Sequence, residues 1–302
     1  MVVKQVIELI GKGCKTMTRH LSYMMIVLNI ATLLGGIASA ADEQPLKVFV
    51  LAGQSNMDGR GGAADLPVDW KQPVKNAVIF DGKAWVPVAP ARGMPGEPDR
   101  WGLFGPELGF SRRMSEKFGQ PIGIVKHGTS GTSLAKDWDL KDPKSHYHVM
   151  LDKIRAAQQS RKIEIIGMLW MQGEADSCSE PMAKAYAANL EALIHASRKD
   201  FGGPKMLFVA GRVNPPETGY RFVKLVRKAQ ERCSLPGYAF VDCDGFATYG
   251  QADLVHFNVS GQMALGQAFA DTMLGLLGKA TGAPAATQDG KTVKSATKPG
   301  AK

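Results

Sequence analysis

Residues 48–57 read VFVLAGQSNM, an apolar run that leads directly into a polar turn. Continuous apolar runs of this length are typical of strands buried on both faces of a parallel sheet. Runs of the same kind, rich in Val, Ile and Phe, recur at residues 77–80, 122–125, 163–171, 206–210 and 239–241. Stretches with helical spacing lie between and after them, at residues 107–118, 147–159, 180–198, 218–233 and 260–277. This order predicts a doubly wound α/β domain.

The first 40 residues have the composition of a secretory signal peptide. A basic region precedes a mostly apolar run at residues 21–37, and residues 38–40 read ASA, which is an A-x-A cleavage site. Cleavage after Ala40 predicts a mature protein that is secreted or periplasmic and is not attached to a membrane. Because the apolar run approaches the length of a bilayer span, an uncleaved anchor is the alternative.

The net charge of +9 is concentrated at the two ends of the chain. The leader contributes +3 and residues 279–302 contribute +4, which leaves +2 for residues 41–278. A nucleic-acid binder would carry its basic excess on the fold, so that class is disfavoured. Residues 279–302 are rich in Ala, Thr, Gly, Pro and Lys and are expected to form a disordered basic tail. We therefore expect a signal peptide at 1–40, one folded domain at 41–278 and a tail at 279–302.

Three cysteines remain after residue 40, namely Cys178, Cys233 and Cys243. Because three is an odd number, at most one intramolecular disulfide can form, and a Cys233–Cys243 bridge stays open on spacing alone. The sequence contains no C-x-x-C motif and no Cys/His cluster that indicates zinc.

Ser55 follows the first apolar run, in a turn that can present its hydroxyl and its own backbone N–H to a ligand. A serine hydroxyl is a weak nucleophile unless a base removes its proton. Asp253-Leu254-Val255-His256, in a loop before the last helix, can supply that base together with a carboxylate that orients it. Taken alone, the first block also fits a capping serine and the second a surface histidine. Together they predict a nucleophilic Ser55 that is activated by His256 and Asp253.

Two further loops follow apolar runs and carry candidate donors for a developing oxyanion. Residues 127–134 read HGTSGTSL, and such a small-residue loop exposes backbone N–H groups. Residues 170–176 read WMQGEAD, in which Gln172 can donate a side-chain N–H to a negative charge. Glu174 can position Gln172 or the neighbouring loops, or can be a solvated loop carboxylate.

Together these blocks resemble the SGNH-hydrolase superfamily. Within it they are most similar to the sialate O-acetylesterase-like and acetylxylan-esterase-like group, carbohydrate esterase family six. The matching blocks are GQSNM at 53–57, SGTSL at 130–134, WMQGEAD at 170–176 and DLVH at 253–256. They occur in the order that the family shows, and the combination is specific although each block alone is weak.

The resemblance implies a three-layer α/β/α sandwich with a central parallel sheet, of the SGNH or flavodoxin-like kind, and an esterase domain at 41–278. It implies hydrolysis of acetyl esters on a carbohydrate through an acyl-enzyme, without a metal or another cofactor. Many members carry Asn where this chain has Gln172, and the Q-G-E form points to the closer group. The implied roles are nucleophile for Ser55, base and then acid for His256, partner carboxylate for Asp253, oxyanion hole for the N–H groups of Ser55 and Gly131 and the side chain of Gln172, and support for Gln54, Asn56 and Glu174.

Three other functions fit parts of the sequence. Residues 59–64 match G-x-G-x-x-A, but they begin too far beyond the first strand for a dinucleotide-binding turn. His146 and His148 near Asp142 allow a metallohydrolase, although such pairs are usually surface loop. The runner-up is a non-catalytic carbohydrate-binding module, in which aromatic side chains of the insertion at 58–105 stack on sugars; those side chains are Trp70, Trp85 and Trp101. The sequence does not choose the acetylated glycan or the oligomeric state.

Overall fold

The computed structural model describes residues 44–90 and 102–281, so the predicted signal peptide, Trp101 and most of the predicted tail lie outside the described residues. All described helices and strands belong to one compact unit that begins at Pro45. The strands are β1 (Leu46–Gly53), β2 (Gly61–Gly62), β3 (Ala77–Phe80), β4 (Trp85–Pro87), β5 (Leu103–Phe104), β6 (Ile122–Gly128), β7 (Ile163–Met171), β8 (Leu207–Arg212) and β9 (Tyr238–Asp242). The α-helices are α2 (Ser55–Asp58), α3 (Pro106–Lys117), α4 (His146–Ser160), α5 (Glu180–Ser197), α6 (Val223–Arg232) and α7 (Val259–Thr281).

All six predicted strands and all five predicted helices are present, and two helix boundaries differ from the prediction by more than one residue. The helix expected from residue 218 begins at Val223, because the segment before it forms turns in which Tyr220 N–H donates to Glu217 O and Val223 N–H to Tyr220 O. The last helix continues to Thr281, three residues into the segment expected to be a tail.

The main sheet has seven strands in the order β4-β3-β6-β1-β7-β8-β9. Six of them are parallel, and β1 pairs with β6 on one side and with β7 on the other. Only β4, for which no strand was predicted, departs from the parallel arrangement, because it runs antiparallel to β3 at the sheet edge. The reason is the short β3–β4 connection, in which Asp81 accepts from the N–H groups of Lys83 and Ala84; a parallel crossover needs a dozen residues or more.

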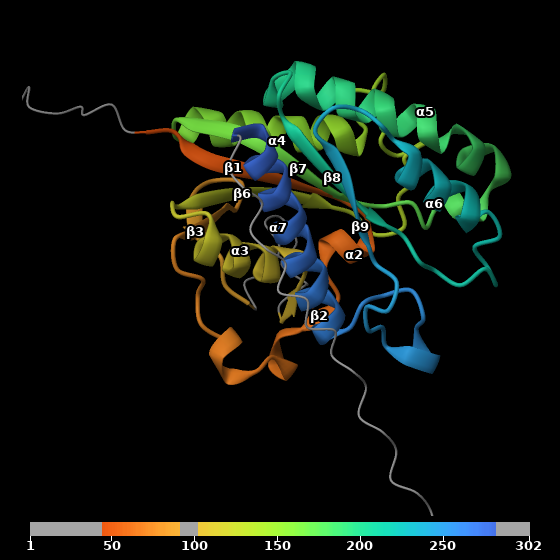
Figure 1. Ribbon diagram of the computed structural model, residues 1–302, viewed down its shortest axis with the longest axis horizontal. Helices are drawn as coiled ribbons and strands as arrows, with labels where there is room; N and C mark the ends of the chain where they lie inside the picture. Colours follow the sequence, from red (N-terminus) through yellow and green to blue (C-terminus); the bar gives the residue numbers. More distant parts are fainter. Residues whose placement is uncertain (1–43, 91–101, 282–302) are drawn as a thin grey trace, which may run out of the picture. The chain divides into compact units, whose positions relative to one another are not determined.

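Helices cover both faces of the sheet, which confirms the three-layer α/β/α architecture (Figure 1). Helices α3 and α7 lie on one face, and α4, α5 and α6 lie on the other. The central strand β1 is buried on both sides, and every side chain from Val48 to Ala52 is fully inaccessible to solvent. On one of these faces Phe49 packs edge-on against Phe110 of α3, with ring centroids 5.0 Å apart. This double burial explains why the first apolar run does not alternate with polar residues.

The cysteines are not bonded to one another. Cys178 is exposed, Cys233 is half-buried and Cys243 is buried, and all three are free. The Cys233–Cys243 bridge, which the spacing left open, is therefore not formed. Cys233 precedes β9 and Cys243 follows it, so the two residues lie at opposite ends of a strand that is about 16 Å long.

None of the described helices combines the length and the apolar composition that a bilayer span requires.

Gly53, at the end of β1, lies close against the backbone of β7. Its φ is +149°, and a Cβ atom at this position would lie 2.0 Å from the carbonyl oxygen of Met171 in β7. We therefore expect Gly53→Ala to lower the free energy of unfolding by about 3 kcal/mol or more, from overpacking together with backbone strain. Chemical denaturation measures this loss.

Gly119→Ala is the matched control for this substitution. Gly119 also has a positive φ, +76°, but a Cβ atom there would meet nothing within 4 Å. Its free energy of unfolding should fall only by the cost of the backbone strain, about 1–2 kcal/mol. Equal losses for the two variants would contradict the steric account.

Candidate active site

The predicted site residues come together at the carboxyl ends of the parallel strands. Ser55 follows β1, Gly131 follows β6 and Gln172 follows β7, so three adjacent strands deliver them to the same edge of the sheet. Asp253 and His256 lie in the loop between β9 and α7. Open α/β sheets bind ligands at this edge, where the strand order switches direction.

Ser55, His256 and Asp253 form a continuous chain of hydrogen bonds. His256 Nε2 lies 2.9 Å from Ser55 Oγ, and His256 Nδ1 lies 2.6 Å from Asp253 Oδ2. Asp253 Oδ1 also accepts from the backbone N–H groups of Val255 and His256 at 2.9 and 3.0 Å. Burial raises the pKa of Asp253, but these hydrogen bonds outweigh burial and hold that pKa below its usual value. An ionised Asp253 is therefore available to stabilise an imidazolium at His256.

The site is open on the histidine side and closed around the serine. The side chains of His256 and Asp253 are 29% and 34% exposed, whereas Ser55 is 2% exposed. The backbone N–H groups of Ser55 and Gly131 donate to no acceptor among the described residues. Both groups are thus available for an oxyanion, which is the role predicted for them.

Gln172 is placed differently from a free oxyanion donor. Its side chain is fully buried, and Nε2 donates to Asp176 Oδ2 at 2.6 Å and to Thr132 O at 3.0 Å. An amide nitrogen has two hydrogens, so a bond to an oxyanion would replace one of these partners. The oxyanion role of Gln172 stays a prediction, and the described geometry shows the amide bracing the two loops.

Asp176 was not singled out from the sequence, although it ends the WMQGEAD block. It is completely buried and also accepts from the backbone N–H groups of Leu134 and Ala135, at 2.8 and 3.1 Å. Burial raises the pKa of Asp176, and the hydrogen bond from Gln172 opposes that rise. The carboxylate ties the loop after β6 to the loop after β7. Its position four residues after Gln172 was the only signal in the sequence.

The three supporting residues also lie in this region. Gln54, Asn56 and Glu174 are all buried, with 4%, 1% and 2% exposed. The Gln54 amide lies 3.3 Å from Gln172 Nε2, and Asn56 Nδ2 donates to Glu174 Oε1 at 3.0 Å. The polar turn after β1 therefore contacts the loop after β7 through side chains on both sides of Ser55.

A buried ion pair, also missed from the sequence, lies beneath the turn that carries Ser55. Lys126 of β6 is fully buried, pairs with Glu107 of α3 and donates to Asp58 O at 3.0 Å. Arg60 donates to Ser130 Oγ, which in turn donates to Asp58 Oδ2 at 3.1 Å. These contacts hold α2 against the loop that follows β6. Lys126 directly follows the apolar run at residues 122–125, and a lysine in that setting was the available signal.

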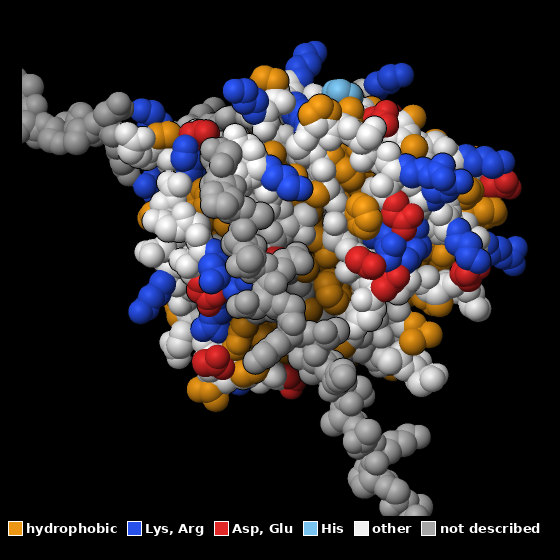
Figure 2. Space-filling model, in the orientation of Figure 1, with side chains coloured by type: hydrophobic (Ala, Val, Ile, Leu, Met, Phe, Trp, Pro, Cys, Tyr) orange, Lys and Arg blue, Asp and Glu red, His pale blue; other side chains and the backbone are white. Residues whose placement is uncertain are grey.

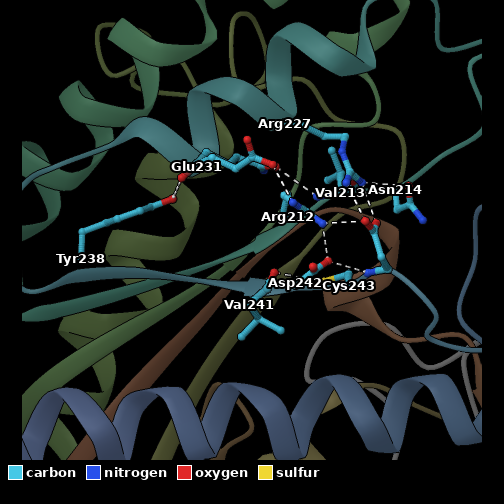
Figure 3. Close-up of polar contacts among 11 residues, drawn as sticks. Arg212, Val213, Asn214, Arg227, Glu231, Tyr238, Val241, Asp242 and Cys243 are labelled. Carbon is cyan, nitrogen blue, oxygen red and sulfur yellow. Dashed lines mark hydrogen bonds and ion pairs between the residues drawn. The ribbon is translucent and has the colours of Figure 1, made fainter.

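The loop that carries Asp253 and His256 leaves the sheet at an ionic cluster (Figure 3). Arg212, at the end of β8, donates to Asp244 Oδ2 at 2.6 Å and also pairs with Asp242 and Glu231. Arg227 of α6 binds both carboxylate oxygens of Asp244 at 2.7 Å, and these bonds lower the pKa of Asp244. Figure 2 shows acidic and basic side chains gathered at the surface in this region, near α6 and β9. The cluster fixes the start of the loop.

An open pocket of about 540 Å³ lies beside this loop. Its wall includes Leu254 and Phe257, which flank the histidine, but neither Ser55 nor His256 lines it. The pocket therefore adjoins the triad without containing it.

Among the described residues, the side chains of the alternative sites have other partners. Trp70 stacks under Arg112 at 4.4 Å, and Trp85 packs against Phe80 at 5.4 Å, so both tryptophans are engaged in the fold. His146 contacts His127, and within the described ranges no group of three Cys, His, Asp or Glu is placed to hold a metal. The glycine-rich stretch at 59–64 forms β2 and a 3-10 turn instead of a strand-to-helix turn.

Comparisons with known proteins relate this chain to carbohydrate esterases. The family model described as "Carbohydrate esterase, sialic acid-specific acetylesterase" matches residues 45–275. A probable carbohydrate esterase of Arabidopsis thaliana is 26% identical over 253 residues, which cover 76% of this chain and 91% of that protein.

Solved structures show the same fold at low sequence identity. An X-ray structure of an Arabidopsis thaliana protein superposes with a TM-score of 0.65 at 23% identity, covering 76% of this chain and 98% of that one. The crystal structure of NanS superposes with a TM-score of 0.61 at 14% identity, covering 78% of this chain and 98% of that one. The structure of a carbohydrate acetylesterase from Xanthomonas citri superposes with a TM-score of 0.55 at 19% identity, covering 74% of this chain and 55% of that one.

His127, at the end of β6, makes stability depend on pH. Burial lowers the pKa of His127 to about 3, and the charge of Lys153 lowers it further. In the unfolded chain a histidine binds its proton near pH 6.5. Between those two pH values the unfolded state binds one more proton than the folded state. The free energy of unfolding should therefore fall by up to about 1.4 kcal/mol for each unit by which the pH is lowered.

His127→Gln should flatten this slope, because glutamine keeps a hydrogen-bonding side chain beside His146 but does not titrate. Denaturation at several pH values between 4 and 7 measures it. The same change at the exposed His195 should leave the slope as in the wild type. An unchanged slope in His127→Gln would rule out this histidine as the source.

Proposed function

The chain belongs to the sialic acid-specific acetylesterase family of carbohydrate esterases, and from that premise we propose that Ser55, His256 and Asp253 hydrolyse acetyl esters of a glycan through an acyl-enzyme. Membership makes the protein a carbohydrate esterase of the serine type. The observation that carries the proposed mechanism is the hydrogen-bonded chain from Ser55 Oγ through His256 to Asp253.

The first half-reaction transfers the acetyl group to the enzyme. Ser55 Oγ attacks the ester carbonyl carbon while its proton passes to His256 Nε2. The carbonyl oxygen becomes an oxyanion that accepts from the N–H groups of Ser55 and Gly131, and Asp253 stabilises the imidazolium at Nδ1. When the intermediate collapses, the bond to the sugar oxygen breaks and His256 returns its proton to that oxygen.

The second half-reaction releases acetate. A water molecule gives its proton to His256 Nε2 and attacks the acetyl-enzyme, and the ester bond to Ser55 breaks as His256 reprotonates Oγ. His256 must be neutral when each attack begins, so the rate should fall in acid. The mechanism requires the sugar oxygen and the water to reach the same nitrogen, and the partial exposure of the His256 side chain is compatible with this requirement.

The assembled triad supports catalysis over the runner-up, a non-catalytic carbohydrate-binding module. A binding module has no need of an ionised aspartate aligned on a histidine that is itself hydrogen-bonded to a serine. Trp70 and Trp85, which that interpretation would need, are engaged by neighbouring side chains. Sialic acid esters are the first substrate class to test because of the family description, with acetylated xylan as the second.

Ser55→Ala should abolish acetate release while the fold is kept. We expect the turnover of p-nitrophenyl acetate and of an O-acetylated sialic acid to fall by about a thousandfold or more, because the nucleophile is lost. Coupled acetate detection measures the rate, and thermal unfolding verifies the fold. Ser260→Ala, an exposed serine four residues after His256, is the matched control and should keep wild-type turnover. Wild-type turnover in Ser55→Ala would remove Ser55 from the mechanism, and an inactive folded wild type would favour the binding module.

We also propose that the protein is exported and that the leader is removed after Ala40. The support is the order of a basic region, an apolar run and an A-x-A site in the sequence. Protein expressed from the full gene in a bacterial host should be recovered from the periplasm or medium with Ala41 at its amino terminus, as read by mass spectrometry. Recovery from the membrane fraction with residues 1–40 intact would contradict this proposal and favour the anchor.

A further inference from the structure

The side chain of Asn56 joins the serine turn to the histidine loop. Asn56 Nδ2 donates to Val255 O at 3.0 Å, and Asn56 Oδ1 accepts from the backbone N–H of Phe257 at 3.0 Å. These two backbone groups lie immediately before and after His256. One buried amide therefore holds the backbone on both sides of the histidine whose ring contacts Ser55.

The arrangement works in only one orientation of the amide. A half-turn about the last side-chain bond would set Asn56 Oδ1 against Val255 O and set Nδ2 against the Phe257 N–H, so acceptor would face acceptor and donor would face donor. Glu174 Oε1 accepts from Asn56 Nδ2 at 3.0 Å, so the reversed amide would also face a carboxylate. Glu174 thus reinforces the orientation that the histidine loop needs.

Glu174 is an unusual group to bury. Its side chain is inaccessible apart from 2%, and no Lys or Arg of the described residues pairs with it. Burial raises the pKa of Glu174, and the hydrogen bond from Asn56 and the charge of His256 oppose that rise. The titratable groups that face it are Asp176 and Cys178 on its own loop, Tyr220 after β8, Cys243 after β9 and His256. A buried acid without a cation partner lowers stability, which fits a role in the site.

We propose that Glu174 is a positioning residue that fixes the Asn56 amide and, through it, holds the His256 imidazole on Ser55. This inference rests on the proposed function, because it needs His256 to be the base. Neither Glu174 nor Asn56 needs to touch substrate. Loss of either should therefore lower kcat and leave KM nearly unchanged.

The test compares Glu174→Ala, Asn56→Ala and the double variant with p-nitrophenyl acetate as substrate. We expect each single variant to lose about ten- to a hundredfold in kcat, as small misplacements of a reacting group do, with KM within about twofold. The double variant should lose no more than the worse single variant, because both changes break the same contact. Glu174→Gln keeps an oxygen that can accept from Asn56 and should recover most of the lost kcat.

The control is Glu164→Ala, the same substitution near the other end of β7, where the carboxylate pairs with Lys47 at the surface. It should keep wild-type kcat. The proposal is overturned by wild-type kcat in Glu174→Ala, by losses that multiply fully in the double variant, or by a Glu174→Gln variant no better than Glu174→Ala.

If Glu174→Ala does not fold, Glu174→Met replaces it, because methionine fills the buried space but cannot accept from Asn56 Nδ2 as a carboxylate does. A fall in kcat that Glu174→Gln does not share supports the proposal, and wild-type kcat in Glu174→Met overturns it. Ser55→Ala separates the two hypotheses, because an active Ser55→Ala refutes the mechanism itself. An inactive Ser55→Ala beside a fully active Glu174→Ala refutes only the positioning role.

Discussion

The hydrogen bond between Ser55 and His256 joins positions 201 residues apart, and much of the polar interior of the described domain serves to maintain it. The serine is fixed by the sheet, because β1 is the central buried strand and Gly53 turns the chain against the end of β7. The histidine lies in a loop, which has no such support of its own. The contacts around that loop therefore decide whether the two atoms meet.

The loop is held at its start, middle and end. Asp244 is bound by two arginines where the chain leaves β9, and Asn258 Nδ2 donates to Thr248 O at 2.7 Å where α7 begins. Between these points Asn56 holds the groups on both sides of His256. Contacts from β8, from α6 and from the turn after β1, together with one bond within the loop, thus constrain one imidazole, which fits the need for a preorganised base.

Most of the fold and the triad could be predicted because their signals are local. A strand buried on both faces must be continuously apolar, and the polar residues that follow such strands mark one edge of the sheet. The β4 hairpin was missed because a three-residue edge strand has no distinctive pattern. Asp176 and Lys126 were missed because a charged side chain reads as surface until its partners, here Leu134, Ala135 and Glu107, are known to lie beside it. The sequence left a Cys233–Cys243 bridge undecided, because spacing in sequence does not say which end of a strand each residue occupies.

The central claim is that the hydrogen-bonded chain activates Ser55 and no other serine. A fluorophosphonate reagent phosphonylates serines activated in this way, and peptide mass spectrometry locates the adduct. The account predicts one adduct, on the peptide that contains Ser55, in folded protein and none after denaturation. Labelling at a different serine, or none in active protein, would contradict it.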